Sequence, residues 1–136
     1  MGVVDALMDT ARADVELLYK LDAQGDDFSI PRQVEFLLKA PSREKADIVR
    51  DFVNEHQYGV ARTLTSDGEF AVEVRVHMPI VQNVIGSVSA FMACLAALYG
   101  LDYDGWGCLV QSALPRPRSR ASKKAVPRKS AKPRRR

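Results

Sequence analysis

The sequence has few of the residues from which catalytic and metal sites are built. Its 136 residues include two cysteines, Cys94 and Cys108, two histidines, His56 and His77, and one tryptophan. The cysteines form no CxxC pair and stand in no His/Cys cluster with metal-ligand spacing, which argues against zinc and redox motifs. No serine or cysteine stands at motif spacing from a histidine to suggest a nucleophile and base. We therefore expect a protein that is not an enzyme and has no catalytic, metal-binding or cofactor-binding residues.

We expect neither a targeting signal nor a membrane-spanning segment. The N-terminus lacks a basic-then-apolar signal peptide. The longest uncharged run, Met78 to Leu101, is long enough for a transmembrane helix. Polar residues such as Gln82 and Asn83 dilute it, however, and no basic flank adjoins it. We expect a cytoplasmic protein that does not contact a membrane.

Acidic residues are absent from the last part of the chain. Residues 115–136 hold eleven Lys or Arg and no Asp or Glu, whereas residues 1–114 hold nine basic and seventeen acidic residues, a net charge of −8. With Val126 as its one large apolar residue, the last segment cannot offset the cost of ordering its backbone, so we expect a disordered tail. Clustered cations attract phosphates or acidic protein. The possible nucleic-acid contacts are Arg116, Arg118, Arg120, Lys123, Lys124, Arg128, Lys129, Lys132, Arg134, Arg135 and Arg136.

The rest of the chain begins with an expected amphipathic helix over residues 3–23, which ends at Gly25. Apolar residues recur there at spacings of three and four. The buried stripe is predicted to be Val4, Leu7, Met8, Ala11, Val15, Leu18 and Leu21.

Four strands and two more helices are predicted to follow. A strand over 32–39 places Val34, Phe36 and Leu38 on a buried face and alternates them with residues of the other face, Gln33, Glu35, Leu37 and Lys39. A helix begins after Ser42 as N-cap and ends at Gly59. A hairpin joins 60–65 to 70–78 through Ser66–Gly68. The last helix has Pro79 in its first turn, and Trp106, Cys108 and Val110 alternate in a final strand.

This order predicts an α+β protein with a ferredoxin-like βαββαβ domain, in which two helices cover one face of a four-stranded antiparallel sheet. The expected organisation is an extra N-terminal helix and linker in residues 1–30, the domain in 31–114 and the tail in 115–136. The other face of the sheet has no aromatic residue on its first and third strands, so the base-stacking platform of an RNA-recognition domain is not expected. Its predicted residues are Gln33, Glu35, Leu37, Lys39, Ala71, Glu73, Arg75 and His77.

The last helix carries small residues where a solvated helix would carry charges. Two interpretations are open: the N-terminal helix of the same chain packs there, which we favour, or another subunit or a partner does. Monomer and homodimer both remain possible. The stripe consists of Gly86, Ala90, Ala93, Cys94 and Ala97.

The segment DYDGWGC, Asp102 to Cys108, also has two interpretations. Gly105 and Gly107 permit backbone conformations closed to other residues, and Trp106 can cover one end of the core. We favour this structural role over partner contact by Asp102, Tyr103, Asp104 and Trp106.

With this order of elements and its YDGWG segment, Tyr103 to Gly107, the chain resembles the regulator of ribonuclease E activity B (RraB) family. The linker GDDFSIPR, Gly25 to Arg32, is also similar to that of the family, and the likeness spans about residues 5–112. The resemblance implies a non-enzymatic protein without a cofactor that binds ribonuclease E or its degradation complex. It also implies a change in transcript abundance through inhibited or redirected RNA cleavage. The possible partner contacts in the motif are Asp102, Tyr103, Asp104, Gly105, Trp106 and Gly107.

The alternative is a nucleic-acid-binding protein. Its basic tail would contact RNA or DNA, and its folded domain would serve as scaffold or dimeriser.

Overall fold

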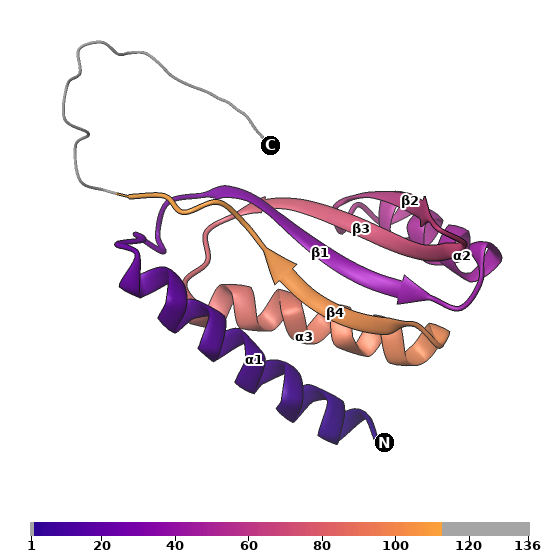
Figure 1. The fold of residues 1–136 in the computed structure, drawn as a ribbon, viewed down its shortest axis with the longest axis horizontal. Coiled ribbons are helices and arrows are strands. Elements are labelled where there is room, and N and C mark those ends of the chain that lie inside the picture. Colours follow the sequence, from indigo (N-terminus) through magenta and orange to yellow (C-terminus); the bar gives the residue numbers. More distant parts are fainter. Residues whose placement is uncertain (1, 113–136) are drawn as a thin grey trace, which may run out of the picture.

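The computed structural model describes residues 2–112, which form three helices and one four-stranded antiparallel sheet (Figure 1). The strand order is β2-β3-β1-β4. The predicted α+β class is confirmed, and the predicted tail lies outside the described residues. The elements are α1 (Val3–Ala23), β1 (Arg32–Ala40), α2 (Arg43–Glu55), β2 (Val60–Ser66), β3 (Glu69–Met78), α3 (Gln82–Tyr99) and β4 (Asp102–Gly107).

The core lies between the sheet and the helices α2 and α3. Val34, Phe36 and Leu38 of β1 are fully buried, and they pair with Val76, Val74 and Val72 of β3 respectively. The helices α2 and α3 add further side chains to the same buried cluster. The alternation predicted for β1 is therefore confirmed, because a strand with one buried face must place every second side chain in the core.

The start of α2 is as predicted, but its end is not. The Ser42 side chain accepts a hydrogen bond from the backbone N–H of Lys45 at 3.2 Å, which caps the helix. The helix ends at Glu55, and Gln57 rather than Gly59 has a positive φ, of 60°. A Cβ on Gly59 would lie 2.7 Å from Val74 Cγ1 and 2.9 Å from the backbone oxygen of Arg75. Gly59 is therefore needed for a close approach to β3, not to end the helix.

The predicted hairpin between β2 and β3 is confirmed. Ser66 pairs with Glu69 across a two-residue turn. In that turn Asp67 has a φ of 52° and Gly68 a φ of 78°. Two positive φ values define the type I′ turn, which matches the twist of antiparallel strands.

The helix α3 begins at Gln82, so the prediction that Pro79 lies in its first turn was wrong. The intervening Ile80 is fully buried, and its N–H donates to the carbonyl oxygen of Phe28 at 2.9 Å. This contact with the linker holds residues 79–81 outside the helix. Farther along α3, Ile85, Met92 and Leu95 are buried.

The helix α1 packs on α3, on the side of α3 away from the sheet (Figure 1). Its predicted stripe was only partly right. Leu18 and Leu21 are buried, but Val4 is 69% and Met8 56% exposed, and the third buried residue is Asp14. The helix therefore presents a face containing a carboxylate to the domain and leaves part of its apolar stripe uncovered.

Candidate protein-binding surface

The YDGWG motif forms a bulge in β4 that turns two aromatic side chains to the same face. Trp106 pairs with Phe36 and Tyr103 with Leu38, so Asp104 and Gly105 together lie opposite one residue of β1. Gly105 has a φ of 96°. In a regular strand, residues three apart point to opposite faces of the sheet. The extra residue of a bulge turns two such residues to the same face. Tyr103 and Trp106 therefore both face the helices.

The two aromatic residues join a buried polar network, which we call the Asp14 network: Asp14, Ser89, Tyr103 and Trp106. Asp14 Oδ1 accepts hydrogen bonds from Trp106 Nε1 at 2.9 Å and from Ser89 Oγ at 3.0 Å. The hydroxyl oxygens of Ser89 and Tyr103 are 2.8 Å apart. Because the single Ser89 proton points to Asp14, Tyr103 must donate to Ser89. The network thus links α1, α3 and β4.

Burial shifts the pKa values of two members of this network. It raises the pKa of Asp14 above 3.8, an effect that the hydrogen bonds from Ser89 and Trp106 oppose. It also raises the pKa of the Tyr103 hydroxyl, so this group stays protonated as a donor. The network therefore fastens α1 to the domain through a carboxylate whose charged form is disfavoured by its surroundings.

The other motif residues lie at the surface. Asp102, Asp104 and Gly107 are exposed. Asp104 Oδ1 is 3.9 Å from Lys39 Nζ, and both side chains are more than half exposed, so this pair adds little stability. Partner contact by Asp102 and Asp104 stays a prediction, whereas Trp106 is buried.

The final strand is shorter than predicted. It ends at Gly107, so placing Cys108 and Val110 in it was wrong. The chain leaves the sheet there and meets the linker between α1 and β1. Burial raises the pKa of the Cys108 thiol, which keeps it in the protonated form.

The contact between the linker and the end of the described chain is a second buried polar group, which we call the linker cluster: Asp26, Asp27, Arg32, Leu109 and Gln111. Arg32 Nη1 lies 2.6 Å from Asp26 Oδ2 in a buried ion pair. Arg32 also donates to the carbonyl oxygens of Asp27 at 2.8 Å and Leu109 at 3.2 Å. The backbone N–H of Asp27 donates to the backbone carbonyl oxygen of Gln111 at 2.7 Å. The Arg32 guanidinium thus joins the linker before β1 to the segment that follows β4.

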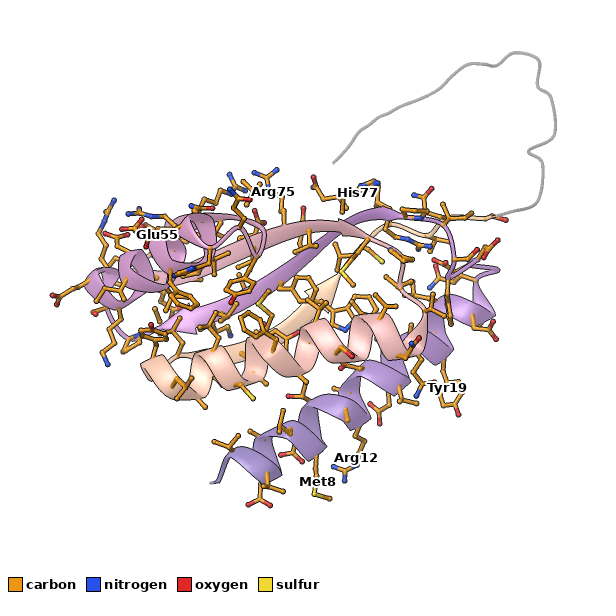
Figure 2. All side chains as sticks on the ribbon, turned by 180° about the vertical axis from the view of Figure 1, so that it is seen from behind. Met8, Arg12, Tyr19, Glu55, Arg75 and His77 are labelled. Carbon is orange, nitrogen blue, oxygen red and sulfur yellow. The ribbon has the colours of Figure 1, made fainter. Side chains whose placement is uncertain are left out.

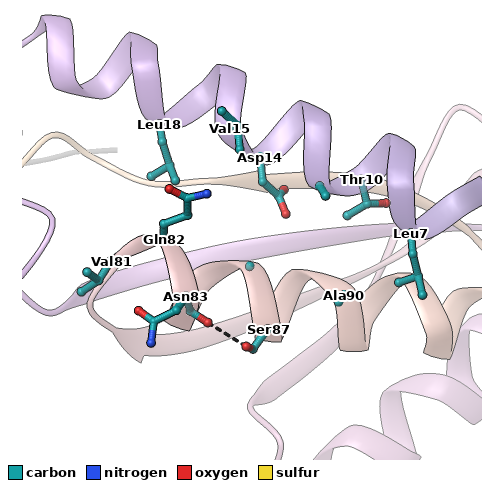
Figure 3. A pocket seen from close by; sticks show the side chains of 12 residues that line it. Leu7, Thr10, Asp14, Val15, Leu18, Val81, Gln82, Asn83, Ser87 and Ala90 are labelled. Atoms are coloured by element: carbon teal, nitrogen blue, oxygen red, sulfur yellow. Dashed lines mark hydrogen bonds between the residues drawn. The ribbon is translucent and has the colours of Figure 1, made fainter. Parts of the chain in front are cut away.

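A groove lies between α1 and α3, on the side away from the sheet (Figure 3). It has a volume of about 710 Å³ and is lined by Leu7, Ala11 and Val15 of α1 and by Gly86 and Ala90 of α3, among others. The favoured prediction that α1 packs on α3 is thus confirmed.

The helix α1 covers only part of the small-residue stripe of α3. Of the five residues of that stripe, Ala93 is buried and Ala97 is exposed. No atom would lie within 4 Å of a Cβ added at Gly86. The two helices are therefore not packed as closely there as small residues would allow.

The outer face of the sheet matches its prediction. Arg75 and His77 project from the side of the sheet opposite α1 and α3 (Figure 2). Gln33 pairs with His77 and Leu37 with Glu73, and none of the eight predicted residues is Phe, Tyr or Trp. The other histidine, His56, packs its ring 4.7 Å from that of Phe52. The paired Phe, Tyr or Trp side chains of an RNA-recognition platform are not among these eight residues.

Within residues 2–112 no group of three or more His, Cys, Asp or Glu side chains is arranged to hold a metal ion. In the same range α3 is the one helix that is long and apolar enough to cross a membrane, by length and composition alone. Because α3 packs against the sheet and α1, as core helices of globular domains do, this is weak evidence for a span.

Comparison with protein families gives a match over residues 11–108 to the family described as regulator of ribonuclease activity B. The chain belongs to this family. The matched residues contain the whole Asp14 network, the sheet and the motif. The first turns of α1 and residues 115–136 lie outside the match. Among curated proteins, none matches the chain.

Sequence reasoning did not find Asp14, Asp26 or Arg32. Signals for two of them were present. Asp14 lies one turn before Leu18 on the apolar side of α1, and Arg32 has the same strand parity as Val34 and Phe36. A charged residue at a core position of a pattern is a candidate for a paired buried group.

Proposed function

We propose that this protein is a non-enzymatic cytoplasmic regulator that binds ribonuclease E by protein–protein contact and inhibits or redirects its cleavage of RNA. The observation that carries the proposal is the family match over residues 11–108, because the family is one of regulators of ribonuclease activity. The strand order β2-β3-β1-β4 and the element order after α1 also support a ferredoxin-like domain. The expected biological result is an altered abundance of transcripts.

The distribution of charge supports contact through the folded domain. Residues 1–114 carry a net charge of −8, which repels RNA and favours a basic protein surface. A regulator of this kind would recognise the enzyme or its degradation complex rather than its substrate.

The test is capture of purified ribonuclease E by the full chain and by a version ending at Leu114, each with and without prior ribonuclease A treatment. We expect both versions to capture the enzyme after RNA removal and to change the rate or pattern of cleavage of a labelled transcript. Capture that disappears with RNA would contradict direct regulation.

A second function is supported by the eleven Lys and Arg of residues 115–136. In this case the tail would bind RNA or DNA and the domain would act as scaffold or dimeriser. Retention of RNA by the full chain alone, with no capture of ribonuclease E by either version, would favour it.

A further inference from the structure

The groove between α1 and α3 continues onto an uncovered apolar surface. We call this surface the outer strip: Val4, Met8, Ala11, Val15 and Tyr19 of α1. Met8 is 56% and Tyr19 72% exposed, and both project away from α3 (Figure 2). An apolar strip beside a groove between two helices has the form of surfaces that accept a third, amphipathic helix.

An accessible oxygen of a largely buried carboxylate faces this groove. Asp14 is 6% exposed, lines the groove and projects between the two helices (Figure 3). Its Oδ1 has the two donors of the Asp14 network, but no donor within residues 2–112 meets its Oδ2. A cationic group entering the groove would supply a donor to this oxygen and the opposite charge.

Charge selects among the helices that could bind there. The helix α1 contains five acidic and two basic residues, and α3 contains no charged residue. A second copy of the domain would bring another surface with a net charge of −8, counted over residues 1–114, against the first. The chain's own tail has cations but only Val126 as a large apolar residue. A helix with both an apolar face and basic residues fits better than either.

We propose that the groove binds a basic amphipathic helix from a partner protein, with its apolar face on the outer strip and one Lys or Arg on Asp14 Oδ2. The groove runs from Leu7 to Leu18, about 17 Å of helix at 1.5 Å per residue, so it would accept about three turns. This rests on the proposed function in that ribonuclease E would supply the helix, but the groove can be tested separately.

The probe is a synthetic 18-residue peptide of Leu, Ala and Lys in a helical amphipathic pattern, labelled with a fluorophore. Its matched controls are the same peptide with Glu for every Lys and a scrambled Lys peptide of identical composition. We expect the full chain to bind the basic amphipathic peptide at least tenfold more tightly than either control, by fluorescence polarisation. Equal binding of the scrambled peptide would mean attraction by charge alone and would overturn the proposal.

Three variants locate the binding. Met8→Gln removes part of the outer strip without changing the charge, and Asp14→Asn removes the groove charge while keeping a carbonyl oxygen for Ser89 and Trp106. Ile48→Gln is the matched control, because Ile48 is a 47% exposed apolar residue on α2. We expect about a tenfold loss of affinity for each of the first two and none for Ile48→Gln. Circular dichroism melting tests whether all three fold.

The same variants separate this inference from the proposed function. If they capture ribonuclease E as well as the unchanged chain does, while peptide binding is lost, the groove is not where the enzyme binds and this inference fails alone. If the peptide binds the groove but ribonuclease E is not captured by any version, the groove stands and the named partner fails.

Two further outcomes assign the groove to another occupant and overturn the proposal. A dimer in sedimentation that Met8→Gln dissociates would assign the groove to a second copy. Peptide binding that appears only after removal of residues 115–136 would assign it to the tail.

Discussion

Asp14 shows how one residue can connect the helix at the N-terminus to the motif near the end of the domain. Its Oδ1 holds Ser89 and Trp106 at 3.0 Å and 2.9 Å, while its burial disfavours the charge that strengthens those bonds. The hydrogen bonds and the charge of this side chain should therefore have opposite effects on stability.

The Asp14→Asn variant should have a free energy of unfolding that depends less on pH. The folded pKa of Asp14 lies above 3.8, so the folded state binds its proton more tightly than the unfolded state does. Stability from this group is present at acidic pH and decreases as the pH rises through the folded value. Urea unfolding at several pH values between about 4 and 7 measures this. Asp9→Asn, which changes an exposed carboxylate, is the control.

The Trp106→Phe variant should be less stable by about 1–3 kcal/mol, because it leaves the buried carboxylate with one donor fewer while keeping an aromatic ring. Urea unfolding at neutral pH tests this. In the Asp14→Asn background the loss should be smaller, since an uncharged acceptor costs less to leave unpaired. Equal losses in both backgrounds would show that ring packing, not the hydrogen bond, is what Trp106 contributes.

At the scale of the elements, the strands with a regular alternation were predictable and the irregular ones were not. In β1 the period of two continues through Val34, Phe36 and Leu38. In β4 the bulge at Gly105 breaks this period, and the linker cluster draws the chain out of the sheet after Gly107. Such an end is set by contacts with residues about 80 positions away, which no local pattern contains.

The helix α1 illustrates a second limit. Periodicity identified its apolar side, but it does not say along how much of that side a neighbour lies. The second half is buried at Leu18 and Leu21, while Val4 remains exposed. The candidate groove was therefore beyond prediction, although the small residues opposite it were visible in α3.

Two glycine substitutions should have opposite effects on the elements that contain or adjoin them. Gly59→Ala would place a Cβ 2.9 Å from a backbone oxygen of β3 and should destabilise the protein by about 1–3 kcal/mol. Gly86→Ala meets no atom within 4 Å and should stabilise α3 by up to about 1 kcal/mol. Thermal unfolding of both variants provides the comparison. A stabilising Gly59→Ala would mean that β3 moves to admit the methyl group.

At the scale of the whole molecule, the division of charge predicts how RNA would be bound. The full chain should retain RNA at low salt and lose it steeply as salt increases, by about a thousandfold between 50 and 200 mM if six or more cations contact phosphates. The version ending at Leu114, whose net charge is −8, should retain none. Filter binding at several salt concentrations measures this. RNA retention by the shortened version would place the binding on the folded domain.

The linker cluster has a consequence for local opening of the molecule. The Asp27 and Gln111 amides lie outside helices and strands, yet they donate to Gln111 O and Asp26 Oδ2 beside a buried ion pair. Their deuterium exchange should be as slow as that of core amides. The two should also exchange together, because Arg32 binds both the linker and the segment after β4, so that opening either one breaks the same cluster. The two ends of the domain would thus form one cooperative unit.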